Sequence, residues 1–347
     1  MEMSETPLHK LSGSVRVDLV GGTLDLHPIN LILPNVYTFN VATSLKSEIE
    51  VCENSSSAII FNSKDYNTVF SFELSDFTQE KLRSDYFKQC TFLSYLLTYF
   101  FDNNFLDKSK GLTFYMKSGS PAGAGLGGSS AMGIVFFQTL LKLTNMSYSH
   151  DRIVSIVQGY ESLILGAGPA GYQDYYPALT GGVLGLKGDP DGIKIEQFFT
   201  TELKSTLENN LVLVYSGQSR QSGINNWEVY KGFFDKNPDI VNGLNEINKI
   251  SYEFREKIRS YDFEALPQLI AKEGEVREQL FPTILTNEMK QLFQDLKELN
   301  LAIGIKVCGA GGGGCFLLVT DNKKDLLNYS FPNGMKVLEF LIEAPLL

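Results

Sequence analysis

Residues 119–133, with the sequence GSPAGAGLGGSSAMG, constrain the fold of this chain more than any other segment. Six of these fifteen residues are glycine, three are serine and none is charged. A strand-like run, GLTFYMK, precedes the segment, and a run of helical length with apolar faces follows it. Because a helix N-terminus presents free backbone N–H groups and a positive dipole end, this order is typical of an anion cradle. A tight connection between a strand and a helix is the alternative.

The segment matches neither of two familiar phosphate loops. It lacks the Gly-Lys-Ser/Thr ending of a Walker A loop, and its glycine spacing and late position do not fit a Rossmann fingerprint. Its glycines still allow positive φ angles and a close approach of the backbone to a phosphate. Taken alone, the loop leaves both interpretations open.

The composition excludes several classes of protein. The chain has 347 residues, of which 43% are hydrophobic and 20% charged, as in a globular protein of one large or two medium domains. The formal net charge of −10 disfavours nucleic acid or an anionic membrane as the main partner, although a local basic site can hold a small anion. The N-terminus lacks the apolar core of a signal peptide, and no apolar run reaches the roughly 18 residues that span a bilayer. We therefore expect a cytoplasmic protein with four reduced, mostly buried cysteines.

The predicted elements change in character near residues 185–205. Strands and helices alternate irregularly before this point, and one helix is predicted over 85–102. After it come a buried strand, three or four helices across 222–299, two strands around a glycine run, a short helix and a strand over 335–342. This order is typical of an α+β protein. We predict an N-terminal domain at 1–190 and a C-terminal domain at 191–347.

Three further segments accompany the loop. RVDLVGGTLD at 16–25 carries an arginine and two aspartates, GPAGYQDYYPALTGG at 168–182 holds one acid, and KVCGAGGGGCF at 306–316 is a second glycine-rich segment. With 121–130, which is similar to a Pro-x-x-x-Gly-Leu-Gly-Ser-Ser loop, they resemble the motifs of the GHMP small-molecule kinases, in the family's order and over nearly the whole chain. The resemblance implies a two-domain fold with the active site in a cleft. Its N-terminal domain is a mixed α/β two-layer domain, and its C-terminal domain is ferredoxin-like with extra helices.

The resemblance also implies ATP and Mg²⁺ and assigns the loop to the ATP phosphates. In the family, a serine at the end of this loop and a glutamate on a following helix contact the metal, which here indicates Ser129, with Ser130 as the alternative, and Glu161. Gly128 stands where many members have the first serine. Without the resemblance, the serines would be helix N-caps and Glu161 a solvated helix residue. The residues expected to bind the ATP phosphates are Pro121, Gly123, Ala124, Gly125, Leu126, Gly127, Gly128, Ser129 and Ser130.

Asp174 and Arg16 are the catalytic residues that the resemblance implies. Asp174 matches the acid that faces the attacking hydroxyl, where it acts as a general base or only orients the hydroxyl. Arg16 matches the basic residue beside that acid, and a cation there stabilises the carboxylate and the charge of the phosphoryl group. A turn-capping Asp174 and a strand-end salt bridge of Arg16 are the structural alternatives.

The string Gly-Gly-Thr-Leu-Asp at 21–25 indicates a sugar substrate by the same resemblance. An aspartate at the position of Asp25 bonds sugar hydroxyls in sugar kinases of the family, and a carboxylate can accept from two vicinal O–H groups. The string is closer to the Gly-Gly-Gly-Thr-Asp of heptose 7-phosphate kinases and fucose kinases than to the Gly-Glu-His-Thr-Asp of galactokinases. The residues expected to bind substrate are Asp25, Thr23, Gly22, His27, Arg220, Gly311 and Gly312.

The stretch VYSGQSRQSGINN at 214–226 supports the heptose-type branch. It resembles a Tyr-Thr-Gly-x-Ser-Arg-x-Ser segment of that branch, which makes Arg220 a candidate contact for a sugar phosphate or for ATP. A strand-to-helix turn with Ser222 as N-cap is the equal alternative.

These observations predict an ATP-dependent kinase of a sugar or sugar phosphate, with the anomeric hydroxyl of D-glycero-D-manno-heptose 7-phosphate as the best candidate. The alternatives are another GHMP kinase, of the galactose, fucose or mevalonate-pathway type, and a non-catalytic binding protein of the same fold. We expect a small-molecule partner and no nucleic acid or membrane. The sequence leaves the oligomeric state open, and it places the adenine pocket only broadly, within 37–115.

Overall fold

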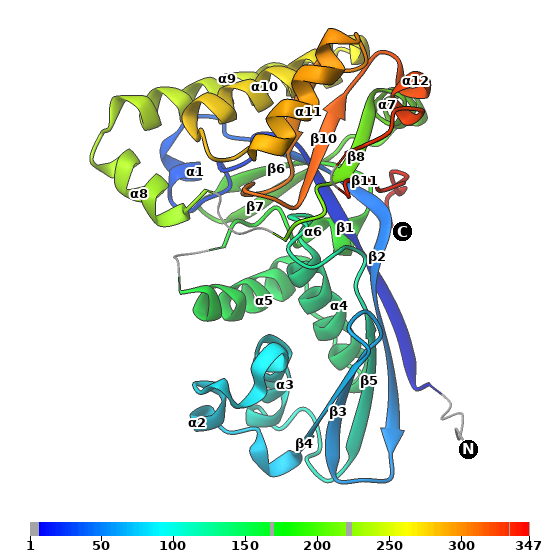
Figure 1. The fold of residues 1–347 in the computed structure, drawn as a ribbon. Coiled ribbons are helices and arrows are strands. Elements are labelled where there is room, and N and C mark those ends of the chain that lie inside the picture. The colour runs from blue at the N-terminus through cyan, green and yellow to red at the C-terminus, as the bar shows by residue number, and fades with distance from the viewer. Residues whose placement is uncertain (1–6, 167–169, 220–223, 333, 347) are drawn as a thin grey trace.

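The computed structural model describes residues 7–166, 170–219, 224–332 and 334–346 (Figure 1). Within these residues the strands form one sheet of seven and one of four, and helices pack on both sheets. This arrangement confirms the predicted α+β class with two parts. No helix in the described ranges has the length and apolar character needed to cross a membrane.

The first sheet belongs to the N-terminal half of the chain and has the strand order β4-β3-β5-β2-β6-β7, with β1 also paired to β2. Its strands are β1 (His9–Val20), β2 (Thr38–Asn54), β3 (Ala58–Ser63), β4 (Thr68–Glu73), β5 (Gly111–Lys117), β6 (Val183–Asp189) and β7 (Gly192–Gln197). All pairs are antiparallel except β3 with β5. Because strand side chains alternate between the two faces, Arg16 and Asp18 of β1 lie on the same face.

Helices cover one face of this sheet (Figure 1). α4 packs against β1 and β2, α6 packs against β1, and α3 and α5 pack on α4. The helix predicted over 85–102 begins only at Thr91, because Lys88 has a φ of 50° that interrupts the helical backbone before α3. The helices of this half are α1 (Ile29–Ile32), α2 (Gln79–Leu82), α3 (Thr91–Asp102), α4 (Gly128–Leu143), α5 (His150–Leu165) and α6 (Tyr176–Thr180), with 3₁₀ helices η1 (Leu74–Asp76) and η2 (Asp85–Cys90).

The second sheet has the order β11-β8-β10-β9, and all of its pairs are antiparallel. Its strands are β8 (Leu211–Tyr215), β9 (Gly304–Val307), β10 (Cys315–Val319) and β11 (Lys336–Val337). The strand predicted over 335–342 is therefore shorter, and Ile342 forms only an isolated bridge to Thr43.

Four long helices lie between β8 and β9, as predicted. α9 buries Leu244, Ile247, Phe254 and Ile258 at helical spacing, and its neighbour α10 packs on β9 and β10. The helices of this half are α7 (Thr201–Asn210), α8 (Asn226–Phe234), α9 (Pro238–Arg259), α10 (Leu266–Leu280), α11 (Asn287–Glu298) and α12 (Lys323–Leu327), with the 3₁₀ helix η3 (Phe263–Ala265).

The two halves meet along β1, against which both α9 and α10 pack. One strand thus carries Arg16 and Asp18 and contacts both parts of the molecule. The domain boundary predicted between 190 and 191 stays a prediction; these residues form the turn between β6 and β7, and the chain enters the second sheet at β8.

Candidate functional site

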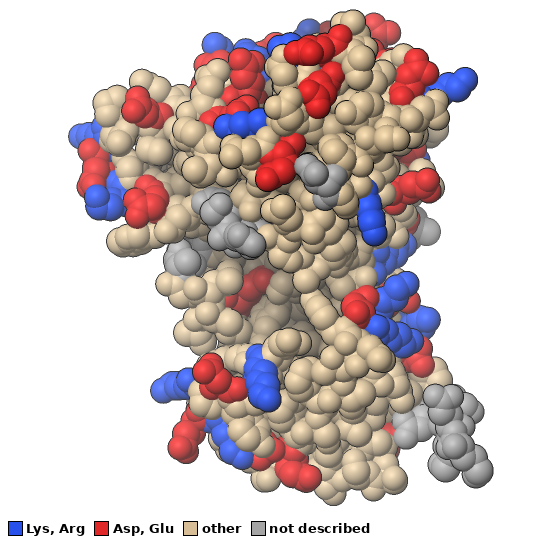
Figure 2. All heavy atoms as spheres, viewed as in Figure 1, with Lys and Arg blue, Asp and Glu red and all other residues tan. Residues whose placement is uncertain are grey.

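Two cavities meet at the glycine loop. The loop cavity, of about 500 Å³, is lined by residues 120–125 and 127–130, by residues within and after β3, by residues of β4 and β5, and by the junction of η2 and α3. The cleft cavity, of about 490 Å³, is lined by residues of β1 and α8 and by the second glycine segment. Figure 2 shows the surface hollowed on this face, between the part that carries α3 and the part that carries α9 and α10. The residues that line both cavities are Gly125, Gly127, Leu165 and Asp174.

Three glycines turn the loop into α4. Gly123, Gly125 and Gly127 have φ angles of 67°, 75° and 69°, a region that glycine adopts without strain. Gly127 is the N-cap of α4, and no side chain caps this helix. The first-turn residues 128–130 line the loop cavity, so their N–H groups and the positive end of the helix dipole are available to an anion.

Backbone hydrogen bonds tie the loop to both sheets. Leu126 O accepts from Arg16 N in β1 at 3.0 Å, and Ala124 O accepts from Cys315 N in β10 at 2.7 Å. The second glycine segment, 309–314, therefore lies directly beside the first. Sequence reasoning placed both segments in one site, and the structure brings them together.

Adding one methyl group at Gly125 is expected to disrupt this junction. A Cβ at this position would lie 2.2 Å from the carbonyl oxygen of Cys308, in addition to the positive φ. We expect G125A to lower the free energy of unfolding in urea by about 1–3 kcal/mol. The matched control is G159A on α5, where a Cβ meets nothing within 4 Å and alanine favours the helix. Equal stability of G125A and G159A would contradict the close packing of the two glycine segments.

Asp174 and Arg16, which lie 158 positions apart in the sequence, form an ion pair. Arg16 Nε donates to Asp174 Oδ1 at 2.8 Å, and Arg16 Nη2 lies 2.7 Å from the same oxygen, whereas Asp174 Oδ2 takes part in neither contact. The Arg16 side chain is 3% exposed and that of Asp174 is 29% exposed, as its place on the shared wall of the cavities requires. Burial acts to lower the pKa of Arg16, but the charges of Asp174 and Asp18 outweigh burial and raise it. Arg16 therefore stays charged beside Asp174.

Glu161 lies on α5, at the side of the loop cavity. Its Oε2 accepts from Ser130 Oγ at 2.8 Å and from Tyr175 OH at 2.6 Å. Burial raises the pKa of Glu161, and these two hydrogen bonds oppose the rise. Ser129 is exposed in the first turn of α4 and lines the same cavity. Ser130 donates directly to Glu161, and a hydrogen bond with Ser129 also opposes the rise in the pKa of Glu161, so both serine alternatives lie beside this carboxylate.

This group fits a magnesium ion. A carboxylate beside serine hydroxyls offers the hard oxygen ligands that Mg²⁺ prefers. Among the residues that the structure describes, no cluster of three or more His, Cys, Asp and Glu is arranged to hold a metal. A Mg²⁺ ion held by Glu161 and Ser130 would thus need further oxygens from a bound phosphate or from water.

Two of the residues predicted to bind substrate, Asp25 and Thr23, line the cleft cavity. Burial, reinforced by the charge of Asp174, raises the pKa of Asp25 to about 7. Asp25 Oδ2 accepts from Gln173 N at 3.2 Å. Thr23 has a φ of 77°, which is rare for a residue with a side chain and indicates local strain at the wall of the cavity.

The other described residues of that set line neither cavity. Gly22 packs against the side chains of Asp18 and Arg277, where a Cβ would lie 2.5 Å from Asp18 Oδ2. His27 is exposed and precedes Pro28. Arg220 and Ser222 lie outside the described residues.

Gly311 and Gly312 serve packing in the second half of the molecule. A Cβ on Gly311 would lie 2.3 Å from Ile284 Cγ1, and Gly312 N donates to Ile284 O at 2.8 Å. The cleft cavity is lined instead by Gly309 and Ala310 of the same segment. The sequence motif located the segment correctly but could not tell which of its residues face the cavity.

Sequence reasoning missed a buried cluster of four charged residues beneath the cleft cavity. Lys306 Nζ lies 3.0 Å from Asp18 Oδ2 and 2.9 Å from Glu273 Oε2. Arg277 Nη1 lies 3.4 Å from Asp18 Oδ2, and Arg277 Nη2 donates to Gly309 O at 2.7 Å. Lys306 is fully buried. The available signal was a lysine between the apolar residues Ile305 and Val307 of β9.

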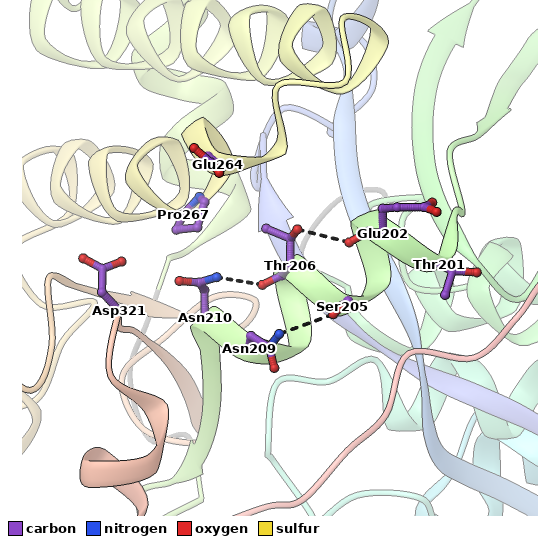
Figure 3. A pocket seen from close by; sticks show the side chains of 9 residues that line it. All are labelled: Thr201, Glu202, Ser205, Thr206, Asn209, Asn210, Glu264, Pro267 and Asp321. Carbon is purple, nitrogen blue, oxygen red and sulfur yellow. Dashed lines mark hydrogen bonds between the residues drawn. The ribbon is translucent and has the colours of Figure 1, made fainter.

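A third cavity, of about 630 Å³, lies away from the glycine loops (Figure 3). It is formed by one side of α7, by the start of α10 and by Asp321. None of its lining residues lines the loop or cleft cavity. Its α7 side chains bond within their own helix: Thr206 to Glu202 O, Asn210 to Thr206 O, and Asn209 to Ser205. We therefore do not include this cavity in the candidate site.

Comparisons with known proteins identify related families. The model of the GHMP kinase N-terminal domain matches residues 90–182, and that of the GHMP kinase C-terminal domain matches residues 254–328. A D-glycero-alpha-D-manno-heptose 7-phosphate kinase of Campylobacter jejuni is 23% identical, over 92% of this chain and 90% of that protein. A bifunctional fucokinase/GDP-fucose pyrophosphorylase of Arabidopsis thaliana is 24% identical over 89% of this chain, which spans only 30% of the length of that relative.

Solved structures of low sequence identity share the fold. A crystal structure of a mevalonate kinase superposes with a TM-score of 0.75 at 20% identity, covering 96% of this chain and 99% of that one. The likeness establishes the fold of the whole described chain, since both halves are covered.

Proposed function

We propose that this chain, which belongs to the GHMP kinase family, transfers the terminal phosphoryl group of ATP to a hydroxyl of a sugar or sugar phosphate. It has both the N-terminal and the C-terminal domain of these kinases. One observation carries the proposal: the loop cavity and the cleft cavity meet at Asp174 and Gly127. ATP phosphates on the α4 N-terminus and an acceptor in the cleft cavity would then face each other beside Asp174.

The residues of the site supply positioning and charge. The N–H groups of the first turn of α4 bind phosphate oxygens, and Arg16 holds Asp174 and adds positive charge where phosphoryl oxygens gather. Asp174 orients the acceptor hydroxyl and accepts its proton as the hydroxyl oxygen bonds to the γ-phosphorus and the bond to the ADP oxygen breaks. Glu161 and Ser130 would hold Mg²⁺, which when bound neutralises charge on the phosphates.

The loop cavity also offers a place for the adenine. Phe70, Phe92 and Leu93 line it beyond the phosphate loop, together with Ser63 and Gln89. Flat apolar surface with a few polar groups suits a purine ring. We propose that the base lies among these residues, which fall within the range 37–115 indicated by the sequence.

The acceptor we propose is D-glycero-D-manno-heptose 7-phosphate, at its anomeric hydroxyl. The heptose 7-phosphate kinase relative, which this chain matches over 90% of its length, supports this choice. Asp25 supports it too, because a buried carboxylate in the cleft cavity suits vicinal hydroxyls. The four cysteines are buried, as expected from the sequence.

Two alternatives have specific support. The fucokinase relative favours another sugar kinase, and mevalonate kinases resemble this chain in sequence as well as in fold. A non-catalytic binding protein would not need the Arg16–Asp174 pair or the Ser130–Glu161 pair, and this chain keeps both.

Replacing Glu161 by glutamine is expected to raise the Mg²⁺ concentration that gives half-maximal activity by at least about tenfold. The amide keeps the size of the side chain but loses the charge that attracts the metal. Since a neutral amide is easier to bury than a carboxylate, E161Q should unfold no earlier than the wild type. ADP release measured across a Mg²⁺ titration checks this, and an unchanged Mg²⁺ requirement would contradict the metal role of Glu161.

A coupled ADP-release assay with ATP and Mg²⁺ tests the proposed function. The acceptors are heptose 7-phosphate, free mannoheptose, mannose, fucose, galactose, N-acetylated hexosamines and mevalonate. Turnover of heptose 7-phosphate above all others is the expected result. Turnover of another sugar alone would change the assigned substrate, and turnover of mevalonate alone would refute the sugar assignment. No turnover of any acceptor, together with no ATP binding by calorimetry, would favour the non-catalytic alternative.

A further inference from the structure

Gln173, which directly precedes Asp174, has a buried polar atom without a hydrogen-bond partner. The residue is 6% exposed and lines the cleft cavity. Its side-chain Oε1 finds no partner among the described residues. A buried carbonyl that gives up water without gaining another donor costs free energy, so such an atom in a folded protein needs an explanation. If the amide were turned over, its N–H₂ group would be the unpartnered atom instead.

The backbone of Gln173 is fixed on both sides. Gln173 N donates to Asp25 Oδ2 at 3.2 Å, and Gln173 O accepts from Asn40 Nδ2 at 3.1 Å. Asn40 lies on the central strand β2, so the side chain of Gln173 leaves a rigid base. Asp25 is itself only 4% exposed. The hydrogen bond from Gln173 N therefore joins two buried cavity-lining residues that come from opposite ends of the N-terminal half.

The charges around this pair restrict what it can bind. Two cationic side chains line the described part of the cleft cavity, Arg16 and Arg277. Arg16 is engaged by Asp174, and Arg277 by Asp18 and Gly309 O. At the inner end of the cleft cavity, beside Asp25 and Gln173, an anionic group would lie next to the carboxylate of Asp25. Among the described lining residues, both cationic side chains already have partners and would not compensate its charge. A group that donates hydrogen bonds is favoured instead.

We infer that Gln173 is a specificity-determining residue that accepts a hydrogen bond from one ring hydroxyl of a polyhydroxylated acceptor, while Asp25 accepts from another. The inference rests on the proposed function and deepens it, because it assigns the inner end of the cleft cavity to the hydroxyl-bearing ring rather than to a charged group. Any phosphate that the acceptor already carries would lie toward the open side. Because Oε1 is closed to water in the free protein, the Gln173 side chain must turn into the cleft cavity for this bond to form.

Gln173→Met separates this role from a structural one. Methionine keeps the length of the side chain and removes an amide whose Oε1 has no partner among the described residues, so Q173M should unfold no earlier than the wild type. For the acceptor that wild-type protein phosphorylates, we expect Q173M to lower kcat/KM by about 10- to 100-fold through a higher acceptor KM, with the KM for ATP unchanged. Gln158→Met is the matched control: Gln158 Nε2 donates to Ala170 O at 2.6 Å, so Q158M loses a bond already made and should unfold earlier.

Monodeoxy analogues of the same acceptor identify the hydroxyl. Wild-type protein should lose activity on each analogue that lacks a hydroxyl bound by the protein. Q173M should be insensitive to the removal of one of these hydroxyls. Asp25→Asn should be insensitive to a different one. These patterns support the inference. It is overturned if Q173M keeps the acceptor KM of the wild type, or if Q173M unfolds earlier, as Q158M does, without any change in acceptor KM.

The same experiment distinguishes failure of the proposed function. If wild-type protein phosphorylates no acceptor of the panel, the proposed function fails and this inference fails with it. If the wild type turns over a sugar but Q173M is indistinguishable from it, only the inference fails. Turnover of mevalonate alone, an acceptor without a hydroxyl-bearing ring, overturns the inference and leaves the kinase activity in place.

Discussion

Asp174→Asn is expected to lower kcat for phosphoryl transfer by about 10²- to 10⁴-fold, the range typical for loss of a general base. Asparagine has nearly the same shape, and its Oδ1 can still accept from Arg16 Nε, which now donates to Asp174 at 2.8 Å. It cannot take the proton of the acceptor hydroxyl. The KM for ATP should change little, because the phosphate-binding N–H groups of α4 are untouched.

Stopped-time assays of ADP release with the identified acceptor check this prediction. The matched control is Asp191→Asn, an exposed acid in the turn between β6 and β7 that pairs with Lys194 at 3.0 Å, far along the chain from either glycine segment. D191N should keep wild-type kcat. Thermal unfolding should first establish that D174N is folded. If the folded variant keeps kcat within a few-fold of the wild type, Asp174 neither accepts the proton nor orients the hydroxyl.

Lys306→Met is expected to lower the free energy of unfolding by about 3–5 kcal/mol, the usual consequence of removing one partner of a buried ion pair. Lys306 is fully buried and bridges Asp18 of β1 and Glu273 of α10. Methionine fills a similar volume but leaves Glu273 with Arg277 alone, at 4.0 Å, and leaves Asp18 with Arg277 at 3.4 Å and the charge of Arg16. The variant should also lose the alignment of the two halves along β1.

The pH dependence of this loss has a definite sign. Burial already raises the pKa of Glu273 in the wild type, and removing the charge of Lys306 raises it further. The folded variant therefore binds more protons than its unfolded chain above the ordinary pKa of glutamate, so its stability falls as pH rises and recovers as pH falls through the raised pKa. The difference between K306M and wild type should shrink on acidification.

Urea unfolding at several pH values measures both effects. Lys272→Met on the same helix α10 is the control, because Lys272 is half-exposed and pairs with Glu246 at 3.6 Å, an interaction of the surface type. K272M should leave the unfolding free energy unchanged. A K306M variant as stable as K272M at neutral pH would contradict the account of the cluster.

The sequence sufficed for the parts of the site that local patterns encode. The glycines of 121–130 and the apolar faces of the following helix indicate a turn into a helix N-terminus, and the resemblance to the GHMP kinases predicted Arg16 beside Asp174. The choice between Ser129 and Ser130 could not be made, because adjacent residues at the start of a helix differ only in the direction that tertiary packing gives them. In the structure Ser130 points inward to Glu161.

The charged cluster could not be predicted from the sequence, because its residues are brought together only by tertiary packing. Asp18 and Lys306 are 288 positions apart, and no local spacing marks them as partners. Their contact exists only because α10, which packs on β9, also packs against β1. Gln173 was missed in the same way: nothing in its neighbours predicts that its backbone is held by Asp25 and Asn40. Gly22 and His27 show the converse, since they stand within a segment predicted to bind substrate but line neither cavity.

Phosphorus NMR of the reaction products tests the central claim most directly. The protein is incubated with ATP, Mg²⁺ and heptose 7-phosphate, and the products are followed by ³¹P spectra with correlation to protons. The account predicts ADP together with an equal amount of a new phosphate ester whose phosphorus couples to the anomeric proton. Release of inorganic phosphate alone, or intact ATP with this acceptor and with every sugar of the panel, would contradict phosphoryl transfer between the two cavities at Asp174.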